Sequence, residues 1–155
     1  MPGVGPSGMA LDASNNLYVV FQSHGVFRGI FKYAPGSGSL SGTNLGITMT
    51  QPGHPHGIAF DRAGDLLLVA DGAPSVPSGV YVYPPGSKTF SRSITARRMF
   101  APTWLAFDQR GERLFVTDGL DIGEYRYSDG KALTSEKQGA AGQPSGVAFD
   151  PPERL

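Results

Sequence analysis

The chain has 155 residues, 39% of them hydrophobic, and its 13 basic residues balance its 13 acidic ones. This length and composition fit one globular domain. A nucleic-acid-binding protein is expected to carry a cluster of basic residues, and the balanced charge without such a cluster argues against that function. No apolar run is long enough to span a membrane, and the absence of cysteine excludes disulfides, thiolate zinc sites and a thiol nucleophile.

One short pattern occurs four times along the chain. It reads Pro-x-x-apolar-Ala-apolar-Asp, with glycine in the third place of three copies, and it starts at Pro6, Pro55, Pro102 and Pro144. The starts are 49, 47 and 42 residues apart. A pattern that recurs at this spacing predicts a repeat architecture.

Each repeat predicts four strands. In the first repeat, about residues 6–51, the expected strands are 8–11, 17–21, 27–33 and a looser one between 40 and 49. In the second repeat, about 55–98, the strands after the opening one are 66–70, 79–83 and 89–95. In the third repeat, about 102–142, they are 114–117, 122–127 and 131–136. Residues 144–155 hold the start of a fourth copy.

Four antiparallel strands in every 40-odd residues are typical of a β-propeller blade. The sequence therefore predicts an all-β partial propeller, with three complete blades and the start of a fourth in one domain, 1–155. Three blades do not close a ring. We expect the chain to be a segment of a longer propeller, or copies of it to close a ring by self-association.

Acidic residues end the opening strand of every repeat, namely Asp12, Asp61, Asp108 and Asp150. An aspartate in this place accepts hydrogen bonds from backbone amides of the following turn. Catalytic groups are seldom duplicated in every repeat, so we assign these four a structural role.

With these residues laid out, the chain resembles the NHL-repeat and gluconolactonase-like β-propellers, which are commonly six-bladed. The resemblance rests on the repeated opening pattern and on the turns Tyr33-Ala34-Pro35-Gly36 and Tyr83-Pro84-Pro85-Gly86. It implies the propeller fold and favours a secreted, periplasmic or cell-surface location, which the composition alone leaves open.

A propeller of this kind would present its candidate site on one face. The chain crosses each blade four times, so the loop entering the first strand and the loop between the second and third strands emerge together. We expect this face to collect the polar and aromatic loop residues Ser7, His24, His54, His56, Asp71, Thr103, Trp104, Asp118, Asp121 and Ser145, with Arg97 and Arg98 close by. Five of them are the candidate ligand-binding residues, namely His56, Asp71, Trp104, Asp118 and Asp121.

The histidines suggest a metal site, because imidazole is a common metal ligand. His56 takes the second place of its repeat, where a similar Pro-His-Gly motif of the peptide-amidating lyases has a zinc-binding histidine. By that resemblance His24, His54, His56 and Asp71 are candidate ligands for zinc or calcium. The corresponding places in the third and fourth repeats hold Thr103 and Ser145 instead.

The gluconolactonase-like enzymes offer a second comparison, since they bind calcium or zinc between carboxylates at the ring axis. They typically carry an asparagine in the second place of a Pro-x-Gly motif and a glutamate near the start of the ring. This chain has His56 in the first role and no glutamate at a blade entrance.

Trp104 stands where the other repeats have Gly8, Gly57 and Gly146. Its ring is suited to stacking on a sugar or another planar group, or to filling space near the axis. No nucleophile elbow, phosphate loop or helical histidine motif occurs, and no catalytic residue is assigned.

The residues favour a binding or scaffold module whose loop face recognises a protein or a small molecule. The first alternative is a metal-assisted lactonase or lyase. The second is a purely structural fragment that assembles into a closed ring.

Overall fold

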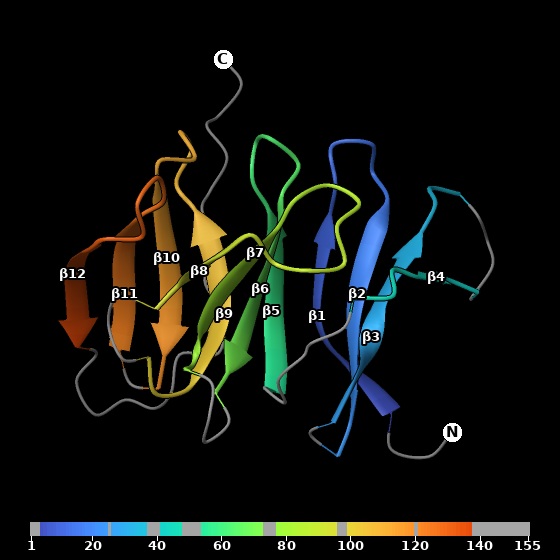
Figure 1. Ribbon diagram of the computed structural model, residues 1–155, viewed down its shortest axis with the longest axis horizontal. Helices are drawn as coiled ribbons and strands as arrows, with labels where there is room; N and C mark the ends of the chain where they lie inside the picture. The colour runs from blue at the N-terminus through green and yellow to red at the C-terminus, as the bar shows by residue number, and fades with distance from the viewer. Residues whose placement is uncertain are drawn as a thin grey trace.

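The structure of the chain is a computed structural model that describes residues 4–24, 26–36, 41–47, 54–72, 77–95, 99–119 and 121–137. Twelve strands and no helix occur within these residues. They form three four-stranded sheets, which stand side by side in Figure 1 and are called blades 1, 2 and 3 in chain order. The start of the fourth repeat lies outside the described residues.

The strands of the three blades have the following bounds. Blade 1 contains β1 (Val4–Leu11), β2 (Leu17–Ser23), β3 (Val26–Tyr33) and β4 (Thr43–Asn44). Blade 2 contains β5 (His54–Phe60), β6 (Leu66–Asp71), β7 (Gly79–Tyr83) and β8 (Arg92–Ile94). Blade 3 contains β9 (Pro102–Phe107), β10 (Arg113–Asp118), β11 (Asp121–Arg126) and β12 (Ala132–Lys137).

Each blade is an antiparallel meander in which consecutive strands are hydrogen-bonded neighbours. This confirms the predicted all-β class and the four-stranded repeat. The fourth strand of blade 2 is shorter than expected, because residues 87–89 form a turn in which Ser87 Oγ donates to the carbonyl oxygen of Thr89 at 2.7 Å. Pairing with β7 begins only at Ser91, whose amide donates to Val82 O at 2.9 Å.

The aspartates that end the opening strands cap the turns that follow, as the sequence predicted. Asp12 Oδ1 accepts from the amides of Ser14 and Asn16, both at 2.9 Å. Asp61 and Asp108 accept from their turns in the same way. Burial raises the pKa of Asp12, but hydrogen bonds from Asn16, Ser14 and Tyr18 outweigh it, so this pKa lies below its ordinary value.

Two apolar cores lie between neighbouring blades, and blade 2 contributes to both. Along β6, Leu66 and Leu68 pack into the core shared with blade 1, whereas Leu67 and Val69 pack into the core shared with blade 3. Successive side chains of a strand point to opposite faces, so a blade covered on both sides must be apolar throughout. This explains the unbroken run from Leu66 to Ala70.

The opening strands β1, β5 and β9 approach one another at two glycines. A Cβ atom on Gly8 would collide with the carbonyl oxygen of His56, and one on Gly57 would lie 2.8 Å from Thr103 O. Both obstacles are backbone atoms, which cannot swing aside. Glycine at this place therefore lets the opening strand of one blade rest against that of the next.

No helix long and apolar enough to cross a membrane occurs in the described part of the chain.

Candidate functional site on the inner-strand face

Those predicted site residues that the structure describes lie at the edge of the blades where β1, β5 and β9 begin. This edge is here called the inner-strand face and is at the bottom of Figure 1. Strand pairing places them there. Val4 is paired with Ser23, next to His24, and His54 is paired with Asp71. In blade 3, Asp118 is paired with both Pro102 and Asp121.

In the three described blades, the second place of the repeat falls in an irregularity of the opening strand that the sequence did not reveal. The register shifts between Pro6 and Gly8, between Pro55 and Ile58, and opposite the step from Thr117 to Asp118. Ser7, His56 and Thr103 occupy these irregular places. A β-bulge redirects the side chain that it carries, and bulges occur often beside binding sites.

Ser7 makes a hydrogen bond between two blades, and Thr103 makes one within its own blade. Ser7 Oγ donates to Pro55 O at 3.1 Å and so links blade 1 to blade 2. Thr103 Oγ1 shares a 2.8 Å hydrogen bond with Thr117 Oγ1, and Thr117 Oγ1 also accepts from the Trp104 amide at 3.0 Å. His56 differs from both, since it brings a titratable, half-buried ring to the same place.

Trp104 lies on the face of blade 3 that points away from blade 2. Its neighbour Leu105 packs into the core between blades 2 and 3, so the alternating side chain of Trp104 belongs to the opposite face. In blades 1 and 2 this place is a glycine against which the next opening strand packs. The half-buried indole of Trp104 stands in place of that glycine.

Asp118 and Asp121 are half-buried at the two ends of the β10–β11 turn. Asp118 Oδ1 accepts hydrogen bonds from the amides of Phe100 and Ala101, both at 2.7 Å. Asp118 therefore fixes the segment that leads into β9, a role that the sequence did not indicate. Asp121 pairs with Lys137 on β12 in the strand register.

The three histidines are divided between two blades. His24 is exposed in the turn between β2 and β3, with a left-handed φ of 50°. His54 is exposed at the first position of β5, two residues before His56. The side chain of Asp71 and the positions of Arg97, Arg98 and Ser145 lie outside the described part of the structure.

A zinc or calcium site requires several ligands that converge on one point. Among the described residues, no three histidine, aspartate or glutamate side chains gather closely enough to hold a metal ion. Zinc takes four ligands in structural sites and three in catalytic ones, and calcium takes six to eight oxygens. The described side chains do not by themselves form such a site.

Comparisons with known proteins were made for the whole chain. No family model matches it, and no curated protein matches it. Solved structures do. In the nidogen/laminin complex, one chain superimposes with a TM-score of 0.72 and 22% identity, over 96% of this chain and 54% of that one.

Two further structures superimpose on the chain. A gluconolactonase from Xanthomonas campestris does so with a TM-score of 0.69 and 21% identity, over 94% of this chain and 52% of that one. A protein of unknown function from Bacteroides caccae has a TM-score of 0.60 and 15% identity, over 88% and 47% of the two chains. The chain thus spans about half the length of each structure.

At these identities the similarity establishes the fold and leaves the activity open. Three observations agree on the fold: the three consecutive four-stranded blades, the contact between their opening strands, and these superpositions. The chain has the fold of three consecutive blades of the NHL-repeat and gluconolactonase-like β-propellers.

Proposed function

We propose that the chain is a binding or scaffold module that recognises its ligand at the inner-strand face. The observation that carries the proposal is the contact between successive opening strands at Gly8 and Gly57, which brings three irregular strand entries together on a rigid frame. The entries carry different side chains, Ser7, His56 and Thr103, although the frame repeats. Rigid sheets that present variable residues at one edge are typical of binding scaffolds.

His56 and Trp104 determine the ligand in this proposal. Neither is required by the repeat, because sister copies have serine or threonine in place of His56 and glycine in place of Trp104. An indole stacks on the flat face of a sugar ring or another planar group, and an imidazole donates or accepts a hydrogen bond beside it. The structural neighbours include a protein complex and a gluconolactonase, so both a protein and a small cyclic sugar derivative are supported as ligands.

Two substitutions that restore the repeat test this assignment. His56→Ser copies Ser7, and Trp104→Gly copies Gly8 and Gly57, so both introduce residues that the same position already tolerates. Isothermal titration with D-glucono-δ-lactone, and separately with glucose, measures binding. We expect the unmodified chain to bind the lactone and each variant to bind it less tightly; equal binding by all three would contradict a role for the inner-strand face in small-molecule recognition.

The alternative function is a metal-assisted lactonase or lyase. A divalent ion in such an enzyme polarises a carbonyl group or lowers the pKa of a bound water. The pairing of His54 with Asp71 across β5 and β6, with His56 two residues away, supports it. Metal analysis after saturation with zinc or calcium tests the idea, with His56→Ala and Asp71→Ala as comparisons. Absence of bound metal together with no lactone hydrolysis would end it.

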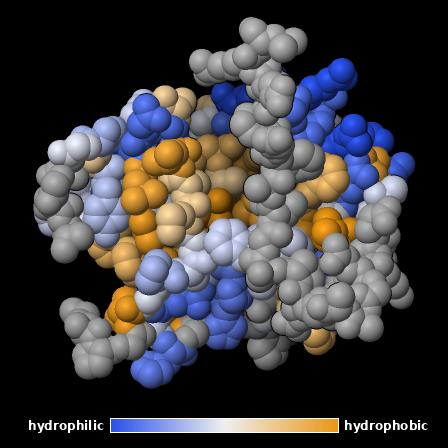
Figure 2. Space-filling view, turned by 180° about the vertical axis from the view of Figure 1, so that it is seen from behind, coloured by the Kyte–Doolittle hydropathy of each residue, from blue (hydrophilic) through white to orange (hydrophobic). Residues whose placement is uncertain are grey.

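We also propose that another blade covers the open face of blade 1, supplied by a longer protein or by a second copy. Met9 and Leu11 are each 59% exposed there, whereas Ile58, at the place of Met9 in blade 2, is 4% exposed. Figure 2, a view from behind, shows hydrophobic residues at the surface. Light scattering tests self-association: we expect multimers that Met9→Ser weakens, and a monomer at all concentrations would contradict the second copy.

A further inference from the structure

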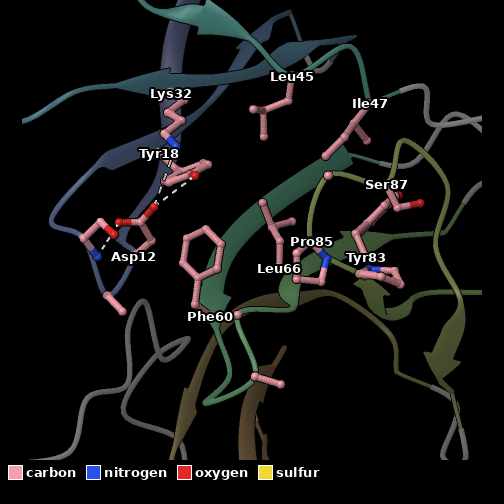
Figure 3. A pocket seen from close by; sticks show the side chains of 16 residues that line it. Asp12, Tyr18, Lys32, Leu45, Ile47, Phe60, Leu66, Tyr83, Pro85 and Ser87 are labelled. Atoms are coloured by element: carbon pink, nitrogen blue, oxygen red, sulfur yellow. Dashed lines mark hydrogen bonds and ion pairs between the residues drawn. The ribbon is translucent and has the colours of Figure 1, made fainter.

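A cavity of about 510 Å³ lies between blades 1 and 2, at the edge opposite to the inner-strand face. It is bounded by the turns that follow β1 and β5 and by the turn that follows β7. Figure 3 shows Lys32, Tyr18 and Asp12 on one side, Phe60 and Leu66 in the middle, and Tyr83 and Pro85 on the other. The volume falls within the range of roughly 300–1,000 Å³ that is usual for small-molecule sites.

The junction between blades 2 and 3 shows how the same place is filled elsewhere in the chain. Tyr127 reaches across it and donates its hydroxyl to Asp61 Oδ2 at 2.8 Å. Its ring meets that of Phe107 edge-on, with 4.8 Å between the centroids. Arg92 lies over the ring at 4.3 Å and donates to Tyr127 O at 2.8 Å. An aromatic ring and a guanidinium therefore close that junction.

Strand register identifies the matching residues of the first junction. Leu66 is paired with Tyr83 in blade 2, and Leu114 is paired with Tyr125 in the same way in blade 3, so the two tyrosines correspond. Two residues further along each chain segment, Pro85 of blade 2 therefore matches Tyr127 of blade 3. On the outer strands, Lys32 is paired with Thr43 in blade 1, and Val82 is paired with Arg92 in the same way in blade 2. Thr43 of blade 1 therefore matches Arg92 of blade 2. A proline and a threonine thus stand in place of the tyrosine and the arginine. The space that those two side chains fill in the second junction is open in the first.

The cavity has mostly apolar walls. Leu45 and Ile47 follow β4 on one side, and Phe60 and Leu66 line it from blade 2. Tyr83 is 2% exposed. Burial, with a smaller contribution from neighbouring Tyr81, raises the pKa of Tyr83 to about 12, so its hydroxyl remains a neutral group at physiological pH.

Two charged residues occur among the described residues that line the cavity, and they differ in how well they are satisfied. Asp12 accepts hydrogen bonds from two backbone amides, from Asn16 Nδ2 and from Tyr18 Oη. Lys32 Nζ lies 3.9 Å from Asp12 Oδ2, which is too long for a hydrogen bond, and 5.5 Å from the centre of the Tyr18 ring. An ammonium group offers three donors, so Lys32 is the group that can take an added anion.

We propose that this cavity binds a small molecule with a planar aromatic body and one anionic group of the carboxylate type. The aromatic body occupies the space that Tyr127 fills in the next junction, against Leu66 and Pro85, and the anionic group pairs with Lys32. The site is separate from the inner-strand face and does not depend on the function proposed for it.

Two fluorescent dyes of nearly the same shape test the proposal. The probe 1-anilinonaphthalene-8-sulfonate carries an aromatic body and one anion, and N-phenyl-1-naphthylamine lacks the anion. We expect the chain to bind the anionic dye more tightly. Lys32→Met keeps the aliphatic stem and removes the charge, so it should weaken the anionic dye about tenfold and leave the neutral dye nearly unchanged. Lys131→Met, at an exposed lysine of blade 3, is the matched control.

A second variant fills the cavity. Pro85→Tyr introduces the residue found at the matching place of blade 3 and should abolish the tight binding of both dyes, with folding verified by circular dichroism. Met9→Ser, on the open face of blade 1, should leave that binding unchanged. An equal loss of both dyes in Lys32→Met, or loss of tight binding in Met9→Ser, would overturn the proposal; if Pro85→Tyr does not fold, the Lys32→Met comparison decides.

Discussion

Replacement of Tyr127 by phenylalanine removes one hydroxyl that joins blades 2 and 3. The lost interaction is the 2.8 Å hydrogen bond to Asp61 Oδ2, between residues 66 positions apart in the chain. The ring contacts with Phe107 and Arg92 remain, so no large cavity forms. The substitution therefore isolates a single polar contact between blades.

The size of the effect follows from the surroundings of Asp61. Its Oδ1 still accepts from the amides of Ala63 and Asp65, at 2.9 and 2.8 Å, and the carboxylate is half-buried, so water can reach the vacated oxygen. We therefore expect a loss near the low end for a hydrogen bond to a charged group, about 1.5 kcal/mol. With a urea dependence of about 1–3 kcal/mol per molar, the unfolding midpoint should fall by about 0.5–1.5 M.

Tyr18→Phe is the matched comparison. Tyr18 donates to Asp12 Oδ2 at 3.1 Å within blade 1, and the same oxygen also accepts from Asn16 Nδ2 at 2.8 Å. Its loss should therefore cost less. Urea unfolding followed by circular dichroism measures both variants. A midpoint for Tyr127→Phe that is equal to that of the unmodified chain would refute the idea that this contact holds the two blades together.

Three further outcomes are expected. Gly57→Ala places a Cβ 2.8 Å from Thr103 O and should destabilise the chain by about 1–3 kcal/mol. Gly5→Ala is the control and should have little effect, because nothing lies within 4 Å of the added Cβ. Thermal unfolding measures both variants, and equal melting temperatures would contradict the strand contact at Gly57. Asp118→Ala leaves the amides of Phe100 and Ala101 without their acceptor and should lower the free energy of unfolding by about 1–3 kcal/mol. Urea unfolding measures this loss, and an unchanged midpoint would show that Asp118 does not fix that segment. Burial opposes ionisation of Asp12 and Asp108, but hydrogen bonds hold both pKa values below 3.8. Their stabilising effect is therefore present above that value and is lost as the pH falls through the folded-state pKa. The melting temperature should decline as the pH falls below about 4, less steeply in Asp108→Asn, and a flat profile would contradict this.

The sequence predicts the blades well because local signals determine them. The strand 79–83 has the expected bounds, and the opening and second strands extend the predicted cores by a few residues. The apolar run of β6 is a local signal, typical of a strand buried on both faces. The turn aspartates were recognised because an aspartate before a tight turn bonds within a few residues of itself.

The candidate site was harder to predict, because its features arise between blades. The shift of register at Ser7, His56 and Thr103 depends on which residues are paired across strands. The use of Asp118 by two amides 17 and 18 residues away is equally non-local. The candidate ligand roles of His56, Asp71 and Trp104 remain predictions.

The cavity between blades 1 and 2 was missed for a related reason. Tyr33, Tyr83 and Tyr127 each precede a turn, a pattern that favours treating them as equivalent. The strand register instead aligns Tyr125 with the first two, and Tyr127 with Pro85. Six residues separate the paired Phe107 and Leu114, whereas five separate the paired Phe60 and Leu66, so counting residues along the chain does not reveal the exchange.

Trp104 is the only tryptophan of the chain, so its fluorescence reports directly on ligand recognition at the inner-strand face. The decisive measurement is this fluorescence during titration with D-glucono-δ-lactone, in the unmodified chain and in His56→Ser. We expect a saturable change in emission with a weaker midpoint in the variant. Binding detected by calorimetry while the emission of Trp104 stays constant would contradict recognition at this face.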